Sequence, residues 1–511
     1  MRSRKAIINT LMAILAEVVT VACGLIAPKL ILDNFGSAYS GITTSIAQFL
    51  RVITLLNAGI AGVTKAALFK PLAQKDTLQI SRILRATEIY MRRIALIFIP
   101  FLVGFGSVYP FFAKSEGDQQ FGWFFTFTLV IIIGLSTFAE YFFGTTYQML
   151  LGADQRQSVI SAVNIGGIIA NTALMVITVR LGCGIHVVKL VSAFVFIAKP
   201  LIFNFYVKRK YKLNMAVEPD NTAVRQRKYA LGHTIANYVH DSTDIVVLTL
   251  FTSLQTVSIY TVYSLVATNL VTVIKTFSSG IDAAFGNMIA KDEKDVLRRN
   301  VRTFETFMYF ISTVVFTTMA LSIVSFISIY TRDAKDAATV NYIQPLFAYL
   351  LSAAQFFYCI RIPYLSVVQA AGHYKQTRNG AYVEAAVNLV ISVILVWHFG
   401  VVGVAVGTLV AMIFRTVQYS LYVFRNIINV NPFGIISKLA IYLSAAAVSV
   451  LIYMLLPKPA PAGYIQWALS AIVIFAYVFA VTLVLTLVFY HKDVKYFFTV
   501  ALRAVGLKKG K

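Results

Sequence analysis

The chain has 511 residues, of which 58% are hydrophobic and 13% charged, and its mean hydropathy is +0.75. This composition excludes a soluble multidomain protein and predicts an all-α polytopic membrane protein. The net charge of +24 fits the excess of Lys and Arg in the cytoplasmic loops of such proteins, so it predicts no nucleic-acid partner.

Apolar runs of about 20 residues predict fourteen transmembrane helices. Their approximate cores are 7–31, 42–68, 94–112, 123–150, 158–179, 185–206, 229–251, 260–288, 308–330, 342–367, 381–398, 404–424, 439–456 and 468–490. Most basic residues lie at the N-terminus, in the even-numbered loops and in the C-terminal tail. The odd-numbered loops carry only Lys114, Arg180, Arg332, Lys335 and Lys458. This bias predicts an even number of spans and two cytoplasmic termini.

Further features complete the topology. The basic N-terminus and the run that continues to Leu32 predict an uncleaved first span, because the run is too long for a signal peptide. Residues 70–93 and 290–307 mix charged and apolar residues and predict short amphipathic helices at the cytoplasmic surface. The cysteines Cys23, Cys183 and Cys359 have no short spacing, which predicts neither a disulfide framework nor a metal site.

Two sequence echoes predict an internal duplication. Asn57 to Asp76 is echoed by Ser278 to Glu293 with an offset of 217 to 221 residues, and Gly152 to Gly184 is echoed by Ala371 to Gly403 with an offset of 217 to 219. An even number of spans in each copy makes the copies parallel, so we expect two pseudo-symmetric six-helix lobes around a central cavity. The predicted division is an N-lobe (1–207), a basic cytoplasmic linker (208–228), a C-lobe (229–425) and an appended pair of spans with the tail (426–511).

The seventh predicted span carries an unusual polar arc. His233, Asn237, His240, Asp241 and Asp244 share one face of a helix that is otherwise apolar. Ionisable groups at membrane depth normally face protein or a water-filled path. Two interpretations stay open: a proton or Na⁺ site, or a mutually satisfied polar seam between helices.

Other charges fall inside predicted spans. Glu17 and Asp241 lie near the midplane of pseudo-equivalent helices, and Arg51 and Lys275 lie in the second span of each copy. With Arg361 in the tenth span, these cations predict a cavity that suits an anionic ligand such as a phosphate or diphosphate. Glu140 is either part of this site or a helix-packing ion pair with Arg51 or Arg361. A group of basic residues near span ends is also explained by snorkelling to headgroups: Lys29, Lys65, Lys189, Lys199 and Arg415.

The sequence lacks the motifs of soluble enzymes. It contains no GxxxxGK[ST], HExxH or GxSxG pattern, which excludes an ATP-driven pump built on this chain alone and predicts no enzymatic activity. The odd-numbered loops are short, which argues against a membrane glycan polymerase or ligase with an extracytoplasmic catalytic domain.

The first span pair provides a family resemblance. The segment from Leu30 to Gly41, between two apolar runs, is similar to a turn of bacterial polysaccharide exporters, and the pattern of Gly152 to Gly184 and Ala371 to Gly403 resembles their fifth and eleventh spans. The chain therefore resembles the Wzx-type oligosaccharide flippases, which belong with the MATE-like transporters to the multidrug/oligosaccharidyl-lipid/polysaccharide exporter superfamily. The resemblance covers roughly residues 1–425.

The resemblance implies a function. A lipid-diphosphate-linked oligosaccharide, the repeat unit of a surface polysaccharide such as lipopolysaccharide, would cross the bacterial inner membrane by alternating access, coupled to H⁺ or Na⁺ and without another cofactor. Glycosyltransferases or a glycan polymerase would be its partners. The implied substrate-binding residues are Arg51, Lys275, Arg361 and Lys29. The implied coupling or gating residues are Glu17, Asp241, Asp244, His240 and Glu140. The alternative is a cation-coupled multidrug exporter of the same superfamily.

Overall fold

The computed structural model describes residues 2–57, 60–116, 120–222, 242–278, 281–432, 434–456 and 461–504. The regular structure in these residues is entirely helical. Among the described residues, twelve helices are long and apolar enough to cross a membrane, or thirteen if the bent pair Ser37–Leu55 and Ile60–Gln74 is one span. The predicted all-α polytopic fold is thereby confirmed, and the chain is a multi-pass membrane protein. A shorter apolar helix, Ser242–Phe251, is the described part of the seventh predicted span.

The helices group into two compact units. Unit 1 comprises Met1–Thr261 and Asp333–Val340, and unit 2 comprises Val262–Arg332 and Asn341–Lys511. The division falls inside helix α12 (Leu254–Thr276), whose first two turns belong to unit 1. The predicted lobe boundaries at 207, 228 and 425 stay predictions.

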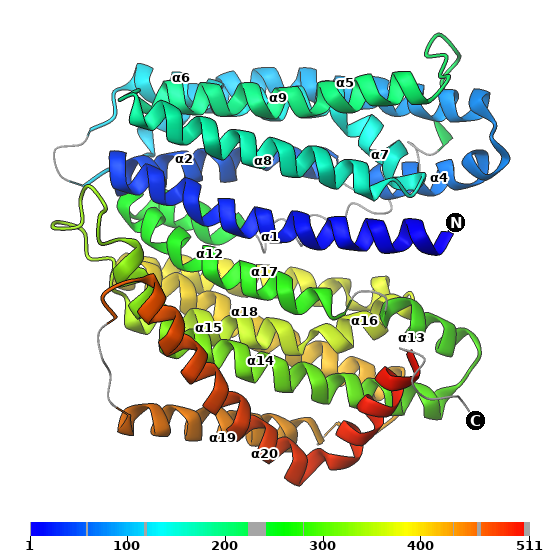
Figure 1. Cartoon of the computed structure of the whole chain (residues 1–511), viewed down its shortest axis with the longest axis vertical. Coiled ribbons are helices and arrows are strands. Elements are labelled where there is room, and N and C mark those ends of the chain that lie inside the picture. The colour runs from blue at the N-terminus through cyan, green and yellow to red at the C-terminus, as the bar shows by residue number, and fades with distance from the viewer. Residues whose placement is uncertain are drawn as a thin grey trace. The chain divides into compact units, whose positions relative to one another are not determined.

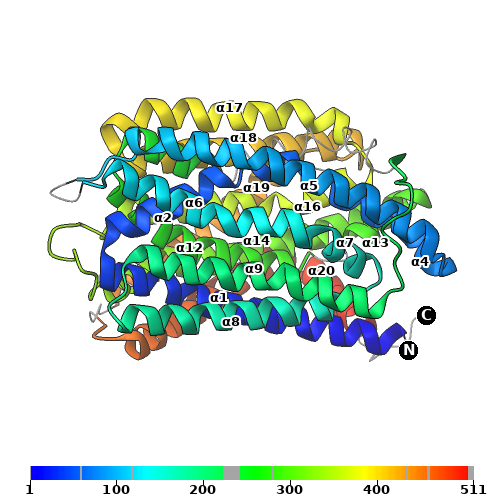
Figure 2. The ribbon, with the colours of Figure 1, turned by 90° about the horizontal axis from the view of Figure 1, so that it is seen from above.

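Unit 1 is built from long antiparallel helices. Its helices are α1 (Arg2–Phe35), α2 (Ser37–Leu50), α3 (Ile53–Leu56), α4 (Ile60–Gln74), α5 (Thr77–Val108), η1 (Tyr109–Phe111), α6 (Trp123–Ala139), the π-helix η2 (Glu140–Gly144), α7 (Thr145–Ala153), α8 (Gln157–Arg180) and α9 (Ile185–Lys210). Helix α1 packs along α8, and α6 packs against α5 and α9 (Figures 1 and 2). A buried cluster around Ile42, Phe98 and Leu129 fills the space between α2, α5 and α6.

Unit 2 is also built from long helices and includes the last two helices of the described chain. It contains most of α12 and then α13 (Ile281–Ala290), α14 (Lys294–Tyr330), α15 (Pro345–Ile360), α16 (Ile362–Ala370), α17 (Tyr374–Phe399), α18 (Val401–Asn426), α19 (Gly434–Leu455) and α20 (Tyr464–Ala504). Helices α17 and α18 lie side by side (Figures 1 and 2), and α14 packs against both α15 and α20.

The segment from Leu30 to Gly41 forms a tight turn that two glycines permit. Gly36 has a φ of +96°, a backbone conformation that residues with a side chain rarely adopt. The backbone N–H of Ser37, at the start of α2, donates to Asp336 Oδ2 at 2.8 Å. A Cβ at Gly41 would lie 1.8 Å from the carbonyl oxygen of Leu254, so only glycine lets α2 approach the start of α12. The segment from Leu30 to Gly41 is therefore a structural turn within unit 1.

Local backbone geometry recurs at an offset of 217 residues. Among the described residues, the non-glycine positions with positive φ include Lys75 (57°) and Asp292 (53°), which end equivalent helices 217 positions apart. Gln155 (55°) and Gly372 (70°) have the same spacing and precede α8 and α17. Left-handed residues are uncommon, so paired positions in one register support the duplication that the sequence predicts.

The prediction of separate surface helices at 70–93 and 290–307 is wrong. Helix α5 runs without interruption from Thr77 to Val108, and α14 from Lys294 to Tyr330. Asp76 caps α5 by accepting a hydrogen bond from the Gln79 N–H at 2.9 Å. After this cap, no proline occurs before Pro100, so the polar segment continues directly into the apolar one.

Candidate functional site

Unit 1 contains a cavity of about 490 Å³ at the irregular ends of α2, α6 and α7. Its polar lining includes Arg51, Asn57, Lys65, Glu140 and Gln148. Arg51 follows the last residue of α2, where the helix breaks before α3, and its side chain is exposed to the cavity. The buried Asn57 Oδ1 has no hydrogen-bond partner among the described residues. A polar cavity with two cations and a free acceptor suits a ligand that carries negative charge and hydroxyl groups.

Two glycines allow the close helix packing beside this cavity. A Cβ at Gly144, the last residue of the π-helix, would lie 2.4 Å from Pro200 Cβ, so α9 packs directly against the point where the helix widens. A Cβ at Gly152 would lie 2.9 Å from Lys65 Cε. The small residue that opens the repeated pattern therefore leaves space for the Lys65 stem beside the cavity.

Glu140 begins the π-helix and lines the same cavity as Arg51. Neither residue forms an ion pair within the described part of the chain, so the predicted packing pair between them is not formed. A π-helix segment is frequently associated with a functional position. The exposed carboxylate of Glu140 is thus available to a ligand or a proton.

Unit 2 contains a cation cluster, which we define as Lys275, Tyr358, Arg361, Glu384 and Arg415. Arg361 Nη1 lies 2.7 Å from Glu384 Oε1, and Arg415 Nε lies 3.2 Å from Glu384 Oε2. The side chains of these three residues are at most 9% exposed. One carboxylate is therefore shared by two buried guanidinium groups, which leaves an uncompensated positive charge.

Tyr358 connects Lys275 to this buried network. Its ring centroid lies 4.6 Å from Lys275 Nζ and 4.4 Å from Arg361 Cζ, so two cations contact one aromatic ring. Lys275 is exposed, in contrast to Arg361 and Arg415. The cluster thus presents one accessible ammonium group, held beside a buried positive charge.

Arg415 is not explained by snorkelling. Its guanidinium is buried, and it donates to the Thr377 carbonyl at 3.1 Å, to Gln418 Oε1 at 2.6 Å and to Tyr419 Oη at 2.6 Å. A Cβ at Gly380 would lie 2.3 Å from Arg415 Nη1. The missing side chain at Gly380 therefore provides the space that this guanidinium occupies.

The remaining predicted residues are dispersed. Asp244 is buried and accepts a hydrogen bond from the Tyr260 hydroxyl at 2.7 Å, while His240 and Asp241 lie outside the described residues. Glu17 is half-buried on α1. Lys29 Nζ lies 3.0 Å from Asp33 Oδ2 and 3.7 Å from Asp333, so its charge is compensated.

Sequence reasoning overlooked Glu384 and Tyr358. A lone carboxylate in the apolar eleventh span was a signal, because a charge at that depth requires a partner. The sharing of Glu384 by Arg361 and Arg415 depends on the packing of α16, α17 and α18, which no sequence spacing reveals.

One known flippase has a similar fold. No family model and no curated protein sequence matches the chain. The solved structure of the lipid II flippase MurJ in an inward closed conformation is similar, with a TM-score of 0.74 and 14% identity over 96% of this chain and 100% of that chain. Because 96% of this chain is aligned, the likeness in fold cannot exclude both α19 and α20, which together are longer than the unaligned part.

Two multidrug transporters are also similar in fold. An inward-facing MATE family transporter has a TM-score of 0.63 and 14% identity over 79% of this chain and 94% of its own. The Vibrio cholerae MATE transporter VcmN, solved as a point mutant, has a TM-score of 0.56 and 15% identity over 84% of this chain and 99% of its own. This chain therefore has the fold that MurJ shares with the MATE transporters.

Proposed function

We propose that this protein is a flippase that moves a lipid-diphosphate-linked oligosaccharide across the cytoplasmic membrane by alternating access, with both termini in the cytoplasm. The observation that carries the proposal is the cation cluster of unit 2. It combines an exposed ammonium, Lys275, with two guanidinium groups that share one carboxylate. The likeness in fold to a lipid II flippase supports the same class of transport.

Each site, taken by itself, has chemistry that fits part of such a substrate. A phosphate requires positive charge, which Lys275 offers in the cluster of unit 2 and Arg51 offers separately in the cavity of unit 1. Hydroxyl groups of a glycan require amide donors and acceptors, which Asn57 and Gln148 provide in the unit 1 cavity. Arg361 contributes its charge through the network and holds Tyr358 in place, since its guanidinium is already paired with Glu384.

Transport in reconstituted vesicles tests the proposal. The wild-type protein should move a fluorescent glycan-diphosphate lipid between leaflets, and the double variant Arg51→Ala with Lys275→Ala should lose most of this activity. The matched control is Lys291→Ala with Lys375→Ala, which removes the same charge from exposed positions outside both sites. Equal transport by the double variant and the control would contradict the phosphate-binding role.

For coupling, we propose that Asp241 or Asp244 binds H⁺ or Na⁺. Asp244 is the one that the structure describes, and its buried carboxylate accepts a hydrogen bond from the Tyr260 hydroxyl. Asp244→Asn should reduce the dependence of transport on pH or on Na⁺. A dependence identical to that of the wild type in both Asp244→Asn and Asp241→Asn would remove both residues from the mechanism.

The alternative is a cation-coupled multidrug exporter, which the likeness to MATE transporters favours. Such an exporter would accept cationic dyes, whereas the positive cluster of unit 2 would repel them. Ethidium efflux by the wild-type protein, together with no movement of the glycan lipid, would establish this second function.

A further inference from the structure

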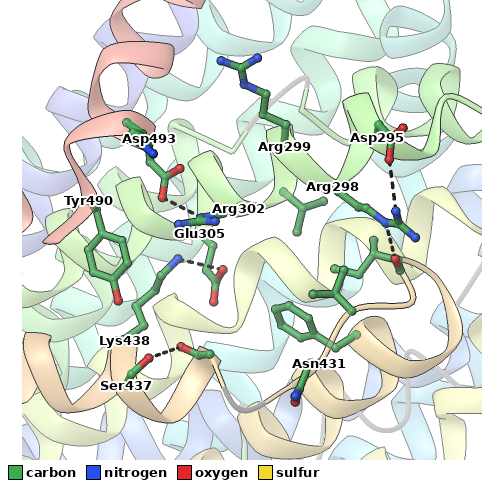
Figure 3. Close-up of a pocket in the computed structure, with 16 residues that line it drawn as sticks. Asp295, Arg298, Arg299, Arg302, Glu305, Asn431, Ser437, Lys438, Tyr490 and Asp493 are labelled. Carbon is green, nitrogen blue, oxygen red and sulfur yellow. Dashed lines mark hydrogen bonds and ion pairs between the residues drawn. The ribbon is translucent and has the colours of Figure 1, made fainter.

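A second basic site lies in unit 2, and its lining shares no residue with the cation cluster. A cavity of about 630 Å³ opens between the first turns of α14, the connection from α18 to α19, and the later part of α20 (Figure 3). We call it the basic pocket. Its charged lining consists of Asp295, Arg298, Arg299, Arg302, Glu305, Lys438, Lys492 and Asp493. The volume falls in the range of small-ligand sites.

Three ion pairs form the wall and floor of the basic pocket. Arg298 Nη1 lies 3.2 Å from Asp295, Arg302 Nε lies 3.1 Å from Asp493, and Lys438 Nζ lies 2.9 Å from Glu305 (Figure 3). The Glu305 and Lys438 side chains are each only 5% exposed. These pairs position three cations before a ligand binds, which lowers the entropy cost of binding.

Two cations remain available. Arg299 and Lys492 are exposed and form no ion pair within the described part of the chain. Arg299 stacks on the Tyr496 ring, with its Cζ 3.9 Å from the centroid, so its guanidinium is held by α20. The pocket therefore has a net positive charge and two exposed cations at its rim.

We place the basic pocket at a membrane surface. Helix α14 has 37 residues, about 55 Å of helix, whereas the hydrocarbon core of a bilayer is about 30 Å thick. The helix is therefore longer than the core, and the charges of Asp295, Arg298 and Arg299 favour a position of its first turns outside the core. The distribution of Lys and Arg predicts that this end is cytoplasmic, where anionic headgroups give the surface a negative potential.

We infer that the basic pocket binds a phosphate-bearing anion, with the headgroup of an anionic phospholipid as the favoured source. Arg299 and Lys492 contact the phosphate, and Arg302, already aligned by Asp493, contributes from the pocket wall. Because α14 belongs to the repeat whereas α19 and α20 are appended, the bound headgroup would join the two parts. The inference is independent of the transported substrate.

Binding of fluorescent short-chain phosphatidylglycerol to the full-length protein in neutral detergent tests the inference. Short-chain phosphatidylcholine is the comparison lipid and should bind more weakly. Arg299→Gln with Lys492→Gln should weaken phosphatidylglycerol binding by about 10-fold or more, because two charge-assisted contacts to the phosphate are lost. Lys291→Gln with Lys495→Gln removes two exposed cations outside the pocket and should leave binding unchanged.

Two further arms identify the ligand and the site. Competition by inorganic phosphate or glycerol 3-phosphate would show that the phosphate alone suffices, and its absence would show that the lipid chains are needed. Arg51→Ala with Lys275→Ala should keep the binding, which separates the basic pocket from the transport sites. Equal binding of both lipids, or loss of binding in that variant but not in Arg299→Gln with Lys492→Gln, would overturn the inference.

Discussion

Glu305 and Lys438 form an ion pair of 2.9 Å between α14 and α19, and each side chain is 5% exposed. The Glu305 carboxylate also accepts a hydrogen bond from the Tyr364 hydroxyl at 2.5 Å, and Lys438 donates to Thr306 Oγ1 at 3.0 Å. The pair thus anchors an appended helix to a helix of the repeat. Both charged groups have hydrogen-bond partners beyond the pair itself, as a buried pair requires.

Breaking this pair from one side should destabilise unit 2. Lys438→Met leaves the buried Glu305 carboxylate without its cation, and such an uncompensated charge costs about 3–5 kcal/mol. Thermal unfolding in detergent should show a clear decrease in Tm. The double variant Glu305→Gln with Lys438→Met removes both charges and should recover much of the loss. A double variant no more stable than Lys438→Met would show that the ion pair is not the source of the effect.

Substitutions of Lys275 and Glu384 should affect transport and thermal stability differently. Lys275→Ala removes an exposed ammonium and should leave the Tm close to that of the wild type while transport falls. Glu384→Gln leaves Arg361 and Arg415 without their shared carboxylate and should destabilise the protein by about 3–5 kcal/mol. Thermal unfolding and lipid transport measured on the same preparations provide the comparison. Equal losses of stability in both variants would contradict this division of roles.

Gly380→Ala should displace Arg415. The added Cβ would lie 2.3 Å from both Arg415 Nη1 and Gln418 Oε1, so both side-chain ends must move. The buried Arg415 Nη1 then loses its bonds to Gln418 and to the Thr377 carbonyl, which costs about 1–3 kcal/mol. The control is Gly166→Ala in α8, where no atom lies within 4 Å of the new Cβ. Alanine is the better helix former by about 1 kcal/mol, so the control should be neutral or stabilising. Tm values that shift equally in both variants would count against the steric role of Gly380.

Asp220 should hold the segment that follows α9 against α5. Its Oδ2 accepts from Gln79 Nε2 at 2.8 Å, and its N–H donates to the Arg82 carbonyl at 3.2 Å. Hydrogen bonds from Thr222 hold the pKa of Asp220 below its ordinary value. Since the folded-state pKa is lowered, this contact contributes fully above the ordinary Asp pKa and is lost as the pH falls through the lowered value.

Hydrogen exchange of residues 211–222 checks this prediction. Asp220→Asn at neutral pH should accelerate exchange of the amide at position 220, as should acidification of the wild type after correction for the intrinsic pH dependence. Glu218→Gln is the matched control, because Glu218 is exposed and its carboxylate forms no hydrogen bond within the described part of the chain. Faster exchange in both variants would point to a general charge effect instead.

Hydropathy predicted the spans because a helix that faces lipid must satisfy its own backbone and expose apolar side chains. The repeat was likewise readable, since turn residues such as Lys75 and Asp292 retained their spacing. The continuity of α5 across its polar and apolar parts was not predicted, because polarity reports the surroundings of a helix and not where it ends. Similarly, the sequence shows that Arg415 lies in an apolar span, but its burial against Glu384 depends on how the helices pack and could not be predicted.

The π-helix of unit 1 ends at Gly144, and 217 positions later Arg361 separates α15 from α16 in unit 2. The interruption in unit 1 is a widened helical turn, and the one in unit 2 precedes Pro363. Different residues therefore interrupt the helix in each half. An irregularity that survives in both copies by different chemical means is most simply inherited. The ancestral six-helix unit would then have had this break before it was duplicated, and the charged side chains Glu140 and Arg361 would have been acquired later, each in its own copy.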